Sequence, residues 1–156
     1  MVKIKQGDIL EANENIVVHQ VNVQGIMGGG VARQLARYYT VLEKEYSEFC
    51  KIYDNDYNKL KGKVFKIMIN GKFIMNMFSQ KENFDTDYEA MKIALEEIKE
   101  YARGFKLSIA MPYKIGCGIA NGDWNEVYKI IEEVFNDYDV TLYKLEKWKA
   151  GYNEQK

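Results

Sequence analysis

The fold of this chain is decided by Ile16-Val17-Val18-His19-Gln20-Val21-Asn22, which continues into Val23-Gln24-Gly25-Ile26-Met27-Gly28-Gly29-Gly30. The β-branched residues of the first part predict a buried strand, and the spacing of Val31–Tyr39 predicts a helix after the glycines. Backbone N–H groups and the helix dipole at such a helix start favour an anion. The pattern is neither a Walker loop nor GxGxxG, so a phosphate cradle and a structural turn are equal alternatives here.

A second glycine-containing loop has the same setting. Leu107–Met111 is predicted to be a short apolar strand, and Pro112–Gly122 is the loop that follows it. Asp123-Trp124-Asn125-Glu126 then forms a capping box, which predicts the start of another helix. Two such loops at strand ends could hold two phosphates, which favours a diphosphate or nucleotide ligand.

The rest of the chain alternates strands and helices. The predicted strands are Val2–Lys5, Val64–Ile69, Phe73–Met77 and Val140–Leu145, with Asn70-Gly71 as a hairpin turn. The predicted helices are Val41–Tyr53 and one that opens at the capping box Thr86-Asp87-Tyr88-Glu89 and stops at Gly104. Asp54–Lys61 is expected to be a polar loop. This order predicts a three-layer α/β/α domain with a mixed, largely parallel sheet and ligands at the strands' carboxyl ends.

Composition excludes several classes of protein. The chain has 156 residues, 47% of them hydrophobic, and 22 basic against 23 acidic residues give a net charge of −1. This balance speaks against a broad nucleic-acid-binding surface. No apolar run is long enough for a membrane span, and two cysteines make neither a disulfide framework nor a metal quartet. We expect a cytoplasmic protein without a metal, a cofactor or a membrane partner.

Short motifs along the chain resemble those of the macrodomain, the ADP-ribose-binding fold. They are Gly7-Asp8-Ile9-Leu10, Val18-His19-Gln20-Val21-Asn22, Met27-Gly28-Gly29-Gly30-Val31-Ala32, Met111-Pro112 and Ile115-Gly116-Cys117-Gly118-Ile119. The resemblance runs in order from Val2 to about Leu145, so residues 1–145 are expected to form the macrodomain and residues 146–156 a tail of unknown placement. It is close in character to the small phage and bacterial "Appr-1-p processing" branch. It is also similar to the branch with ADP-ribose-1″-phosphate phosphatase and the terminal ADP-ribose glycohydrolase.

The resemblance implies a set of ligand-binding residues. Asp8 would accept a hydrogen bond from the adenine amino group, with the Ile9 backbone beside it, and Asn22 would face the distal ribose. The first loop would line the distal ribose and its phosphate with Met27, Gly28, Gly29, Gly30 and Val31. The second would wrap the diphosphate through the backbone of Ile115, Gly116, Cys117, Gly118, Ile119 and Ala120. Tyr143 could flank the cleft or stack on adenine, with core packing as the alternative.

Two positions depart from the lysyl-type glycohydrolases of this fold. Gln80 stands where those enzymes carry their catalytic lysine, with Lys81 one residue late, and Ala120 stands where they carry an aspartate. A covalent lysine mechanism is therefore not expected.

His19 and Asp123 are the candidate catalytic residues. Imidazole exchanges protons near neutral pH, so His19 could activate water at a phosphomonoester; the alternative is a buried, hydrogen-bonded histidine. Asp123 could be a general acid or base, and an N-cap role also explains it. Cys117 has no neighbouring lysine or histidine in sequence and is expected to be a packed thiol rather than a nucleophile.

The expected function is binding of ADP-ribose and hydrolysis of a derivative, foremost ADP-ribose 1″-phosphate to ADP-ribose and phosphate. One alternative is an ADP-ribosyl hydrolase that removes ADP-ribose from macromolecules, in which case nucleic acid would be a partner only as the ADP-ribosylated substrate. The other is a module that binds ADP-ribose without turnover.

Overall fold

The central sheet has six strands in the order β1-β6-β5-β2-β4-β3, and only the β3–β4 pair is antiparallel. The computed structural model describes residues 1–145; the expected tail, residues 146–156, lies outside the described residues. The elements are β1 Val2–Gln6, the 3-10 helix η1 Ile9–Glu11, β2 Ile16–Val21, α1 Gly30–Tyr38, α2 Leu42–Ile52, α3 Tyr57–Leu60, β3 Val64–Ile69, β4 Lys72–Phe78, α4 Tyr88–Phe105, β5 Ile109–Pro112, α5 Trp124–Val134 and β6 Val140–Lys144. The mixed, largely parallel sheet is confirmed.

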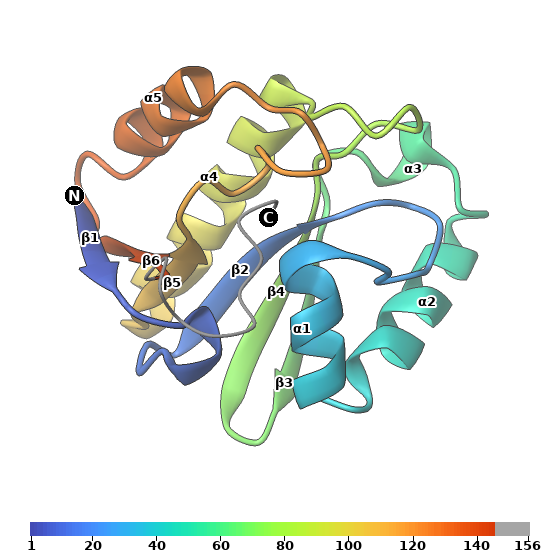
Figure 1. The fold of residues 1–156 in the computed structure, drawn as a ribbon, viewed down its shortest axis with the longest axis horizontal. Coiled ribbons are helices and arrows are strands. Elements are labelled where there is room, and N and C mark those ends of the chain that lie inside the picture. Colours follow the sequence, from blue (N-terminus) through green and yellow to red (C-terminus); the bar gives the residue numbers. More distant parts are fainter. Residues whose placement is uncertain (146–156) are drawn as a thin grey trace.

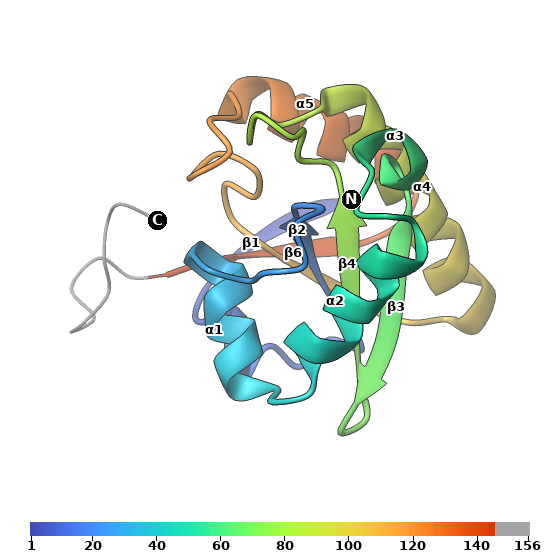
Figure 2. The same ribbon diagram turned by 90° about the vertical axis from the view of Figure 1, so that its right-hand side faces the viewer.

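Helices cover both faces of the sheet, which confirms the three-layer architecture (Figures 1 and 2). Side chains alternate along each strand, so Ile16 and Val18 of β2 pack with α4 and α5, whereas Val17 and Val21 pack with α1 and α2. Every residue of β2 except Gln20 is buried, as expected for a central strand. Because β2 and β5 are neighbouring parallel strands, their carboxyl ends lie side by side.

Both ends of α4 differ from the prediction. Its N-cap is Asp87, whose side chain accepts a hydrogen bond from the Ala90 N–H at 3.1 Å, and not Thr86. Thr86 is instead in a β-bridge with Gln80, which holds it in extended conformation. The helix continues past Gly104 and ends at Phe105, and its C-cap Lys106 adopts a left-handed conformation (φ 57°). Apolar contacts of the last turn, including buried Ala102, outweigh the helix-breaking tendency of glycine.

The segment expected to be a polar loop contains a short helix. Asp56 caps α3 by accepting a hydrogen bond from the Asn58 N–H at 2.9 Å. Tyr57 and Leu60 are buried against the α1/α2 face, and the Tyr57 hydroxyl donates to Asp87 at 2.7 Å. Four residues are too few for a periodicity signal, so tertiary contacts decide this helix.

Within residues 1–145, no helix combines the length and the apolar character that crossing a membrane requires.

Candidate functional site

Two loops meet at the carboxyl ends of the central strands, as the sequence predicts. We call residues 22–29 the β2–α1 loop and residues 113–123 the β5–α5 loop. Their contact is close: a Cβ atom built on Gly29 would lie 2.7 Å from Cδ1 of Ile119. Ile119 is 65% exposed, so its side chain reaches across from one loop to the other. The structure therefore brings Gly29 and Ile119, both expected to bind ligand, to one place.

Asn22 organises the β2–α1 loop. Its Oδ1 accepts hydrogen bonds from the Gln24 N–H at 2.9 Å and from the Tyr46 hydroxyl at 2.7 Å, and its Nδ2 donates to the Ile26 carbonyl at 3.3 Å. The expected contact with a distal ribose has to coexist with these bonds. Met27 is buried, and its N–H donates to Glu43 Oε2 at 2.7 Å. Met27 thus anchors the loop on α2 through its backbone.

The start of α1 leaves backbone donors unused. Gly29 is the N-cap and has no side chain to accept a hydrogen bond, and Gly30 has a φ of 58°, which favours glycine. The N–H groups of Gly28, Gly29 and Gly30 have no hydrogen-bond acceptor within residues 1–145. Unused N–H groups at a helix start form a site for an anion.

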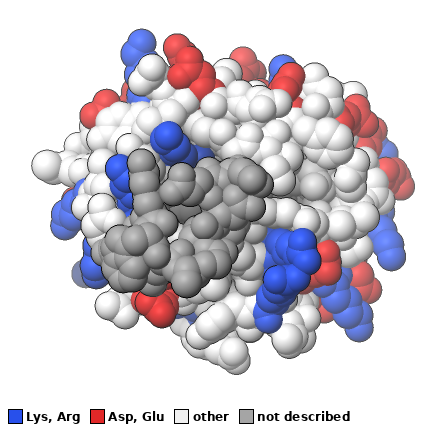
Figure 3. Space-filling view, viewed as in Figure 1, with Lys and Arg blue, Asp and Glu red and all other residues white. Residues whose placement is uncertain are grey.

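Helix α1 carries basic side chains, and the carboxylate of Glu43 lies beside the loop that precedes it. Arg33 and Arg37 are the basic residues of α1, and both are exposed. Figure 3 shows Lys and Arg side chains grouped over this helix. Arg33 lies one turn after the helix start, where its charge favours an anionic ligand, whereas Arg37 lies in the last turn of α1.

The β5–α5 loop is folded tightly on itself. The Gly122 N–H donates to the Gly116 carbonyl at 2.9 Å, and a Cβ atom on Gly122 would lie only 2.3 Å from that oxygen. Gly116 has a φ of 77°, in the left-handed region. Among the described residues, no acceptor is found for the N–H groups of Gly118, Ile119 and Ala120. This loop therefore also presents free main-chain donors, as a diphosphate cradle requires.

Cys117 is half-buried in this loop. Its Sγ lies 3.5 Å from the Ile115 carbonyl, and burial raises the pKa of the thiol to about 11. A thiol with such a pKa is protonated at neutral pH, which agrees with a packed thiol rather than a nucleophile. Ile115 and Ala120 are buried at the two ends of the loop.

The expected adenine end lies where β1 and β6 finish. Asp8 is half-buried, and its Oδ1 accepts a hydrogen bond from the Leu10 N–H at 3.0 Å, which caps η1. Ile9 is buried beside it. The Tyr143 ring is 6% exposed, its hydroxyl donates to Glu14 at 2.7 Å, and burial raises its pKa to about 12. Tyr143 packs in the α1/α2 core, so its surroundings match the core alternative better than an open stacking surface.

His19 lies in the interior of the protein. It is 1% exposed, and its Nε2–H donates to Asn76 Oδ1 at 2.6 Å on the neighbouring strand β4. Its Nδ1 has no hydrogen-bond partner within residues 1–145, and burial lowers its pKa to about 4. An imidazole shielded from water is poorly placed to transfer protons to a ligand, so this position favours the structural alternative, and the catalytic role of His19 stays a prediction.

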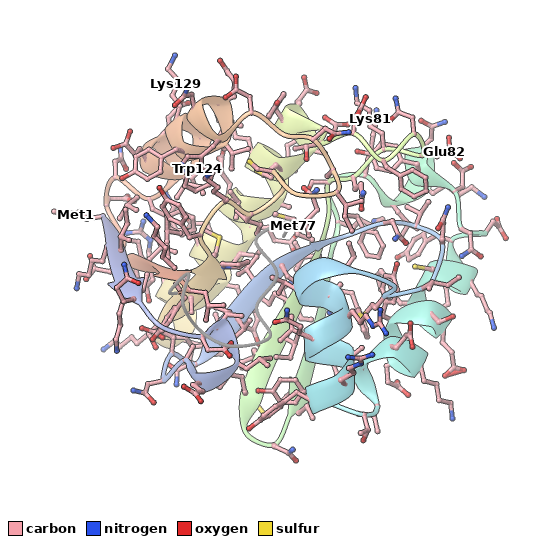
Figure 4. All side chains as sticks on the ribbon, in the orientation of Figure 1. Met1, Met77, Lys81, Glu82, Trp124 and Lys129 are labelled. Atoms are coloured by element: carbon pink, nitrogen blue, oxygen red, sulfur yellow. The ribbon has the colours of Figure 1, made fainter. Side chains whose placement is uncertain are left out.

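Asp123 is exposed at the start of α5. Its side chain accepts a hydrogen bond from the Asn125 N–H at 2.9 Å, which confirms the N-cap, and its own N–H donates to the Tyr88 hydroxyl at 2.9 Å. The next residue, Trp124, lies 4.9 Å from Tyr113 and 5.5 Å from Tyr128 between ring centroids, which fixes the helix start (Figure 4). Asp123 is thus both a cap and accessible to a ligand.

The two positions that depart from the lysyl-type pattern, Gln80 and Ala120, are both buried. Gln80 is buried, and its Nε2 donates to the Phe84 carbonyl at 3.2 Å. Lys81 is exposed and lies with Glu82 at the outer rim of the loop between β4 and α4 (Figure 4). Sequence reasoning missed three polar residues that hydrogen-bond to one another and to the β5–α5 loop, Gln20, Ser79 and Thr86, because nothing in their spacing indicates that they meet.

Comparison with known proteins gives consistent results. The Macro domain family model matches residues 18–131. The chain is 25% identical to the ADP-ribose 1″-phosphate phosphatase of Saccharomyces cerevisiae, over 90% of this chain and 96% of that protein. It is 26% identical to the ADP-ribose glycohydrolase OARD1 of Bos taurus, over 90% of this chain and 89% of that protein.

A solved structure shares the fold along nearly the whole described chain. The macrodomain of Mycobacterium tuberculosis DarG superposes with a TM-score of 0.78 at 27% identity, over 92% of this chain and 97% of that one. The match to the family model, the sheet order and the two glycine loops agree with one another. The chain belongs to the macrodomain family.

Proposed function

We propose that this protein binds ADP-ribose and hydrolyses ADP-ribose 1″-phosphate to ADP-ribose and inorganic phosphate. The observation that carries the proposal is the pair of main-chain cradles at the ends of β2 and β5. Both present N–H groups that have no acceptor within residues 1–145. The similarity to the yeast ADP-ribose 1″-phosphate phosphatase supports the choice of substrate.

In this proposal the ligand lies in a defined direction across the carboxyl ends of the strands. Asp8 and Ile9 hold adenine, and residues 115–120 hold the diphosphate through main-chain N–H groups. The terminal phosphate meets the uncapped start of α1, with Val31 in its first turn. Fixed N–H donors stabilise charge that develops on the transferring phosphoryl group without reorganisation.

The chemical step is a hydrolysis. The oxygen of water forms a bond to phosphorus, the bond between phosphorus and the 1″ oxygen breaks, and the 1″ oxygen leaves with a proton as the hydroxyl of ADP-ribose. Asp123 is our candidate for the general acid or base, because it is exposed beside the β5–α5 loop whereas His19 is buried. Positioned general acids and bases contribute about 10²–10⁴-fold.

Calorimetric titration with ADP-ribose, with AMP as the control ligand, tests the binding site. Micromolar binding of ADP-ribose and much weaker binding of AMP would support it. Release of inorganic phosphate from ADP-ribose 1″-phosphate then tests the reaction. Absence of ADP-ribose binding would refute both the binding site and the reaction.

A second candidate function is removal of ADP-ribose from a macromolecule. The similarity to the bovine ADP-ribose glycohydrolase favours it. The positions of Gln80 and Ala120 count against a lysine-based route to that reaction. Release of free ADP-ribose from an ADP-ribosylated protein or nucleic acid, without phosphate release from ADP-ribose 1″-phosphate, would favour this alternative. Binding of ADP-ribose without either release would indicate a binding module.

A further inference from the structure

A chain of hydrogen bonds lies under the β5–α5 loop. The Ser79 hydroxyl donates to Gln20 Oε1 at 2.6 Å, and Gln20 Nε2 donates to Thr86 Oγ1 at 3.1 Å. The Thr86 hydroxyl in turn donates to the Gly116 carbonyl at 2.6 Å. Ser79 and Thr86 are buried, so water does not compete for these bonds. Three separate segments, the ends of β2 and β4 and the start of α4, are thereby joined to the loop.

Thr86 holds the loop at two points. Its hydroxyl binds the carbonyl of Gly116, and its backbone N–H donates to the carbonyl of Ala120 at 3.0 Å. Between these points lie Gly118 and Ile119, which are exposed and have N–H groups without an acceptor among the described residues. Both carbonyl oxygens are turned toward buried Thr86, so neither opposes an anion on the outer side of the loop.

The order of donors fixes the direction of the Thr86 hydroxyl. A hydroxyl has one proton to donate and accepts through its lone pairs. Because Gln20 donates to Thr86 Oγ1, the Thr86 proton is directed to Gly116. Because Ser79 donates to Gln20 Oε1, the Gln20 amide is held in the orientation that makes it a donor to Thr86. The network thus has one consistent arrangement of protons, which runs from Ser79 to the loop.

We propose that Thr86 is a positioning residue for the diphosphate: it holds residues 116–120 in the shape that presents their N–H groups, and Gln20 and Ser79 fix the direction of its hydroxyl. This inference rests on the proposed binding of ADP-ribose. It assigns no chemistry to Thr86, which is buried beneath the loop. It also gives a reason why Thr86 does not cap α4, since its hydroxyl is engaged by the loop.

Thr86→Val tests the proposal, because it keeps the branched shape and removes the hydroxyl. We expect ADP-ribose to bind about tenfold more weakly, the effect of losing a buried hydrogen bond. Adenosine, which lacks the diphosphate, should bind as it does to the unchanged protein in an NMR titration. Thr86→Ser keeps the hydroxyl and should restore ADP-ribose binding to within about twofold. Thr141→Val, in the middle of β6, is the matched control and should change neither affinity.

Ser79→Ala is the second variant, useful if Thr86→Val does not fold. It frees the Gln20 amide to turn, and we expect a loss of about threefold for ADP-ribose with adenosine unchanged. Equal binding of ADP-ribose by Thr86→Val and the unchanged protein would overturn the inference. So would an equal loss for ADP-ribose and adenosine, since that indicates general destabilisation.

Failure of the proposed function gives a different result. In that case the unchanged protein itself would not bind ADP-ribose. NMR order parameters of the Gly118 and Ile119 amides in the ligand-free protein then test the role of Thr86 directly. Lower order parameters in Thr86→Val would support the positioning role, and unchanged ones would overturn it.

Discussion

The helices α1 and α5 both follow a glycine loop at the carboxyl end of a central strand, yet their N-termini differ. At α5 the Asp123 side chain accepts a hydrogen bond from the Asn125 N–H, so the helix supplies its own acceptor. At α1 the N-cap is Gly29, which has no side chain to do so. The two helices would therefore bind an anion in different ways under our proposal. At α1 the donors are the N–H groups of the uncapped helix start, whereas at α5 they are the N–H groups of the loop before a capped helix.

The other helix starts show that α1 is the exception. The helices η1, α3 and α4 begin at Asp8, Asp56 and Asp87, each of which accepts a hydrogen bond from a backbone N–H of the first turn. Helix α2 has no side-chain cap, but its Leu42 N–H donates to the Tyr39 carbonyl. Within residues 1–145, aspartate therefore caps four helices, counting α5. The glycine at α1 is therefore the position at which our proposed phosphate site can be tested most directly.

Gly29→Asp would give α1 an aspartate N-cap like that of α5, and it should weaken ligand binding more than any other substitution proposed here. The new carboxylate would occupy the free N–H groups and repel a phosphate. Loss of two charge-assisted hydrogen bonds at about 1.5–3 kcal/mol each predicts at least about 100-fold weaker binding of ADP-ribose 1″-phosphate by calorimetry. Gly29→Ala is the control: its Cβ meets only the flexible, exposed end of Ile119. Equal affinities for the two variants would show that α1 does not hold the phosphate.

A substitution of His19, in the strand before the β2–α1 loop, tests whether this histidine has a structural or a catalytic role. Burial lowers its pKa from 6.5 to about 4, so the unfolded chain binds a proton in this range and the folded one does not. Titration of His19 therefore leaves the free energy of unfolding unchanged above pH 6.5. As the pH decreases from 6.5 toward 4, it lowers the free energy of unfolding by about 3 kcal/mol in total. His19→Gln, which retains a donor for Asn76, should remove this part of the pH dependence in urea unfolding. It should keep phosphate release at pH 7, and a loss there without loss of folding would restore the catalytic role.

Asp123 tests whether the capped helix also takes part in the reaction. Asp123→Asn preserves an acceptor for the helix start but removes the acid or base. We expect kcat for phosphate release to fall about 100-fold with KM unchanged. Asp123→Ser retains the cap as well and should have the same effect on kcat. If both variants keep the full kcat, Asp123 is a cap alone.

Substitution of Asp8 should have a smaller effect than the changes at Gly29, His19 and Asp123. Asp8→Asn keeps an oxygen for the Leu10 N–H, so η1 stays capped, but the side chain loses its second acceptor for the adenine amino group. ADP-ribose should bind about tenfold more weakly, with unfolding unchanged. The matched control is Asp56→Asn at the start of α3, which should leave the affinity as it is. Unchanged affinity in Asp8→Asn would remove the adenine assignment and leave the phosphate sites untouched.

Periodicity predicted most of the fold. β3 was predicted with the bounds that the structure has, and β1, β2, β4, β6, α1 and α2 within one or two residues at each end. The prediction was wrong at the start of α4 because Thr86 and Asp87 are both good cap residues. Tertiary contacts favour Asp87: Thr86 forms a bridge with Gln80 and bonds to Gly116, and Asp87 accepts a hydrogen bond from Tyr57.

The candidate site was predicted less completely than the fold. The glycine loops are visible in sequence because each follows a predicted strand and precedes a predicted helix. The burial of His19 is not visible, since a histidine on a strand can face either a cleft or a core. Its partner Asn76 is 57 residues away in the chain, and the pairing of β2 with β4 brings the two side chains together.

By itself, the sequence determined the order of strands and helices, the glycine loops and the family, because these depend on local spacing and on short motifs. Tertiary structure alone decided which groups meet: the His19–Asn76 pair, the contact of Ile119 with Gly29, and the line of bonds from Ser79 through Gln20 and Thr86 to Gly116. The physical reason is that a polar side chain must find its partner wherever the packed layers bring one within about 3 Å, and the distance along the chain does not constrain that choice.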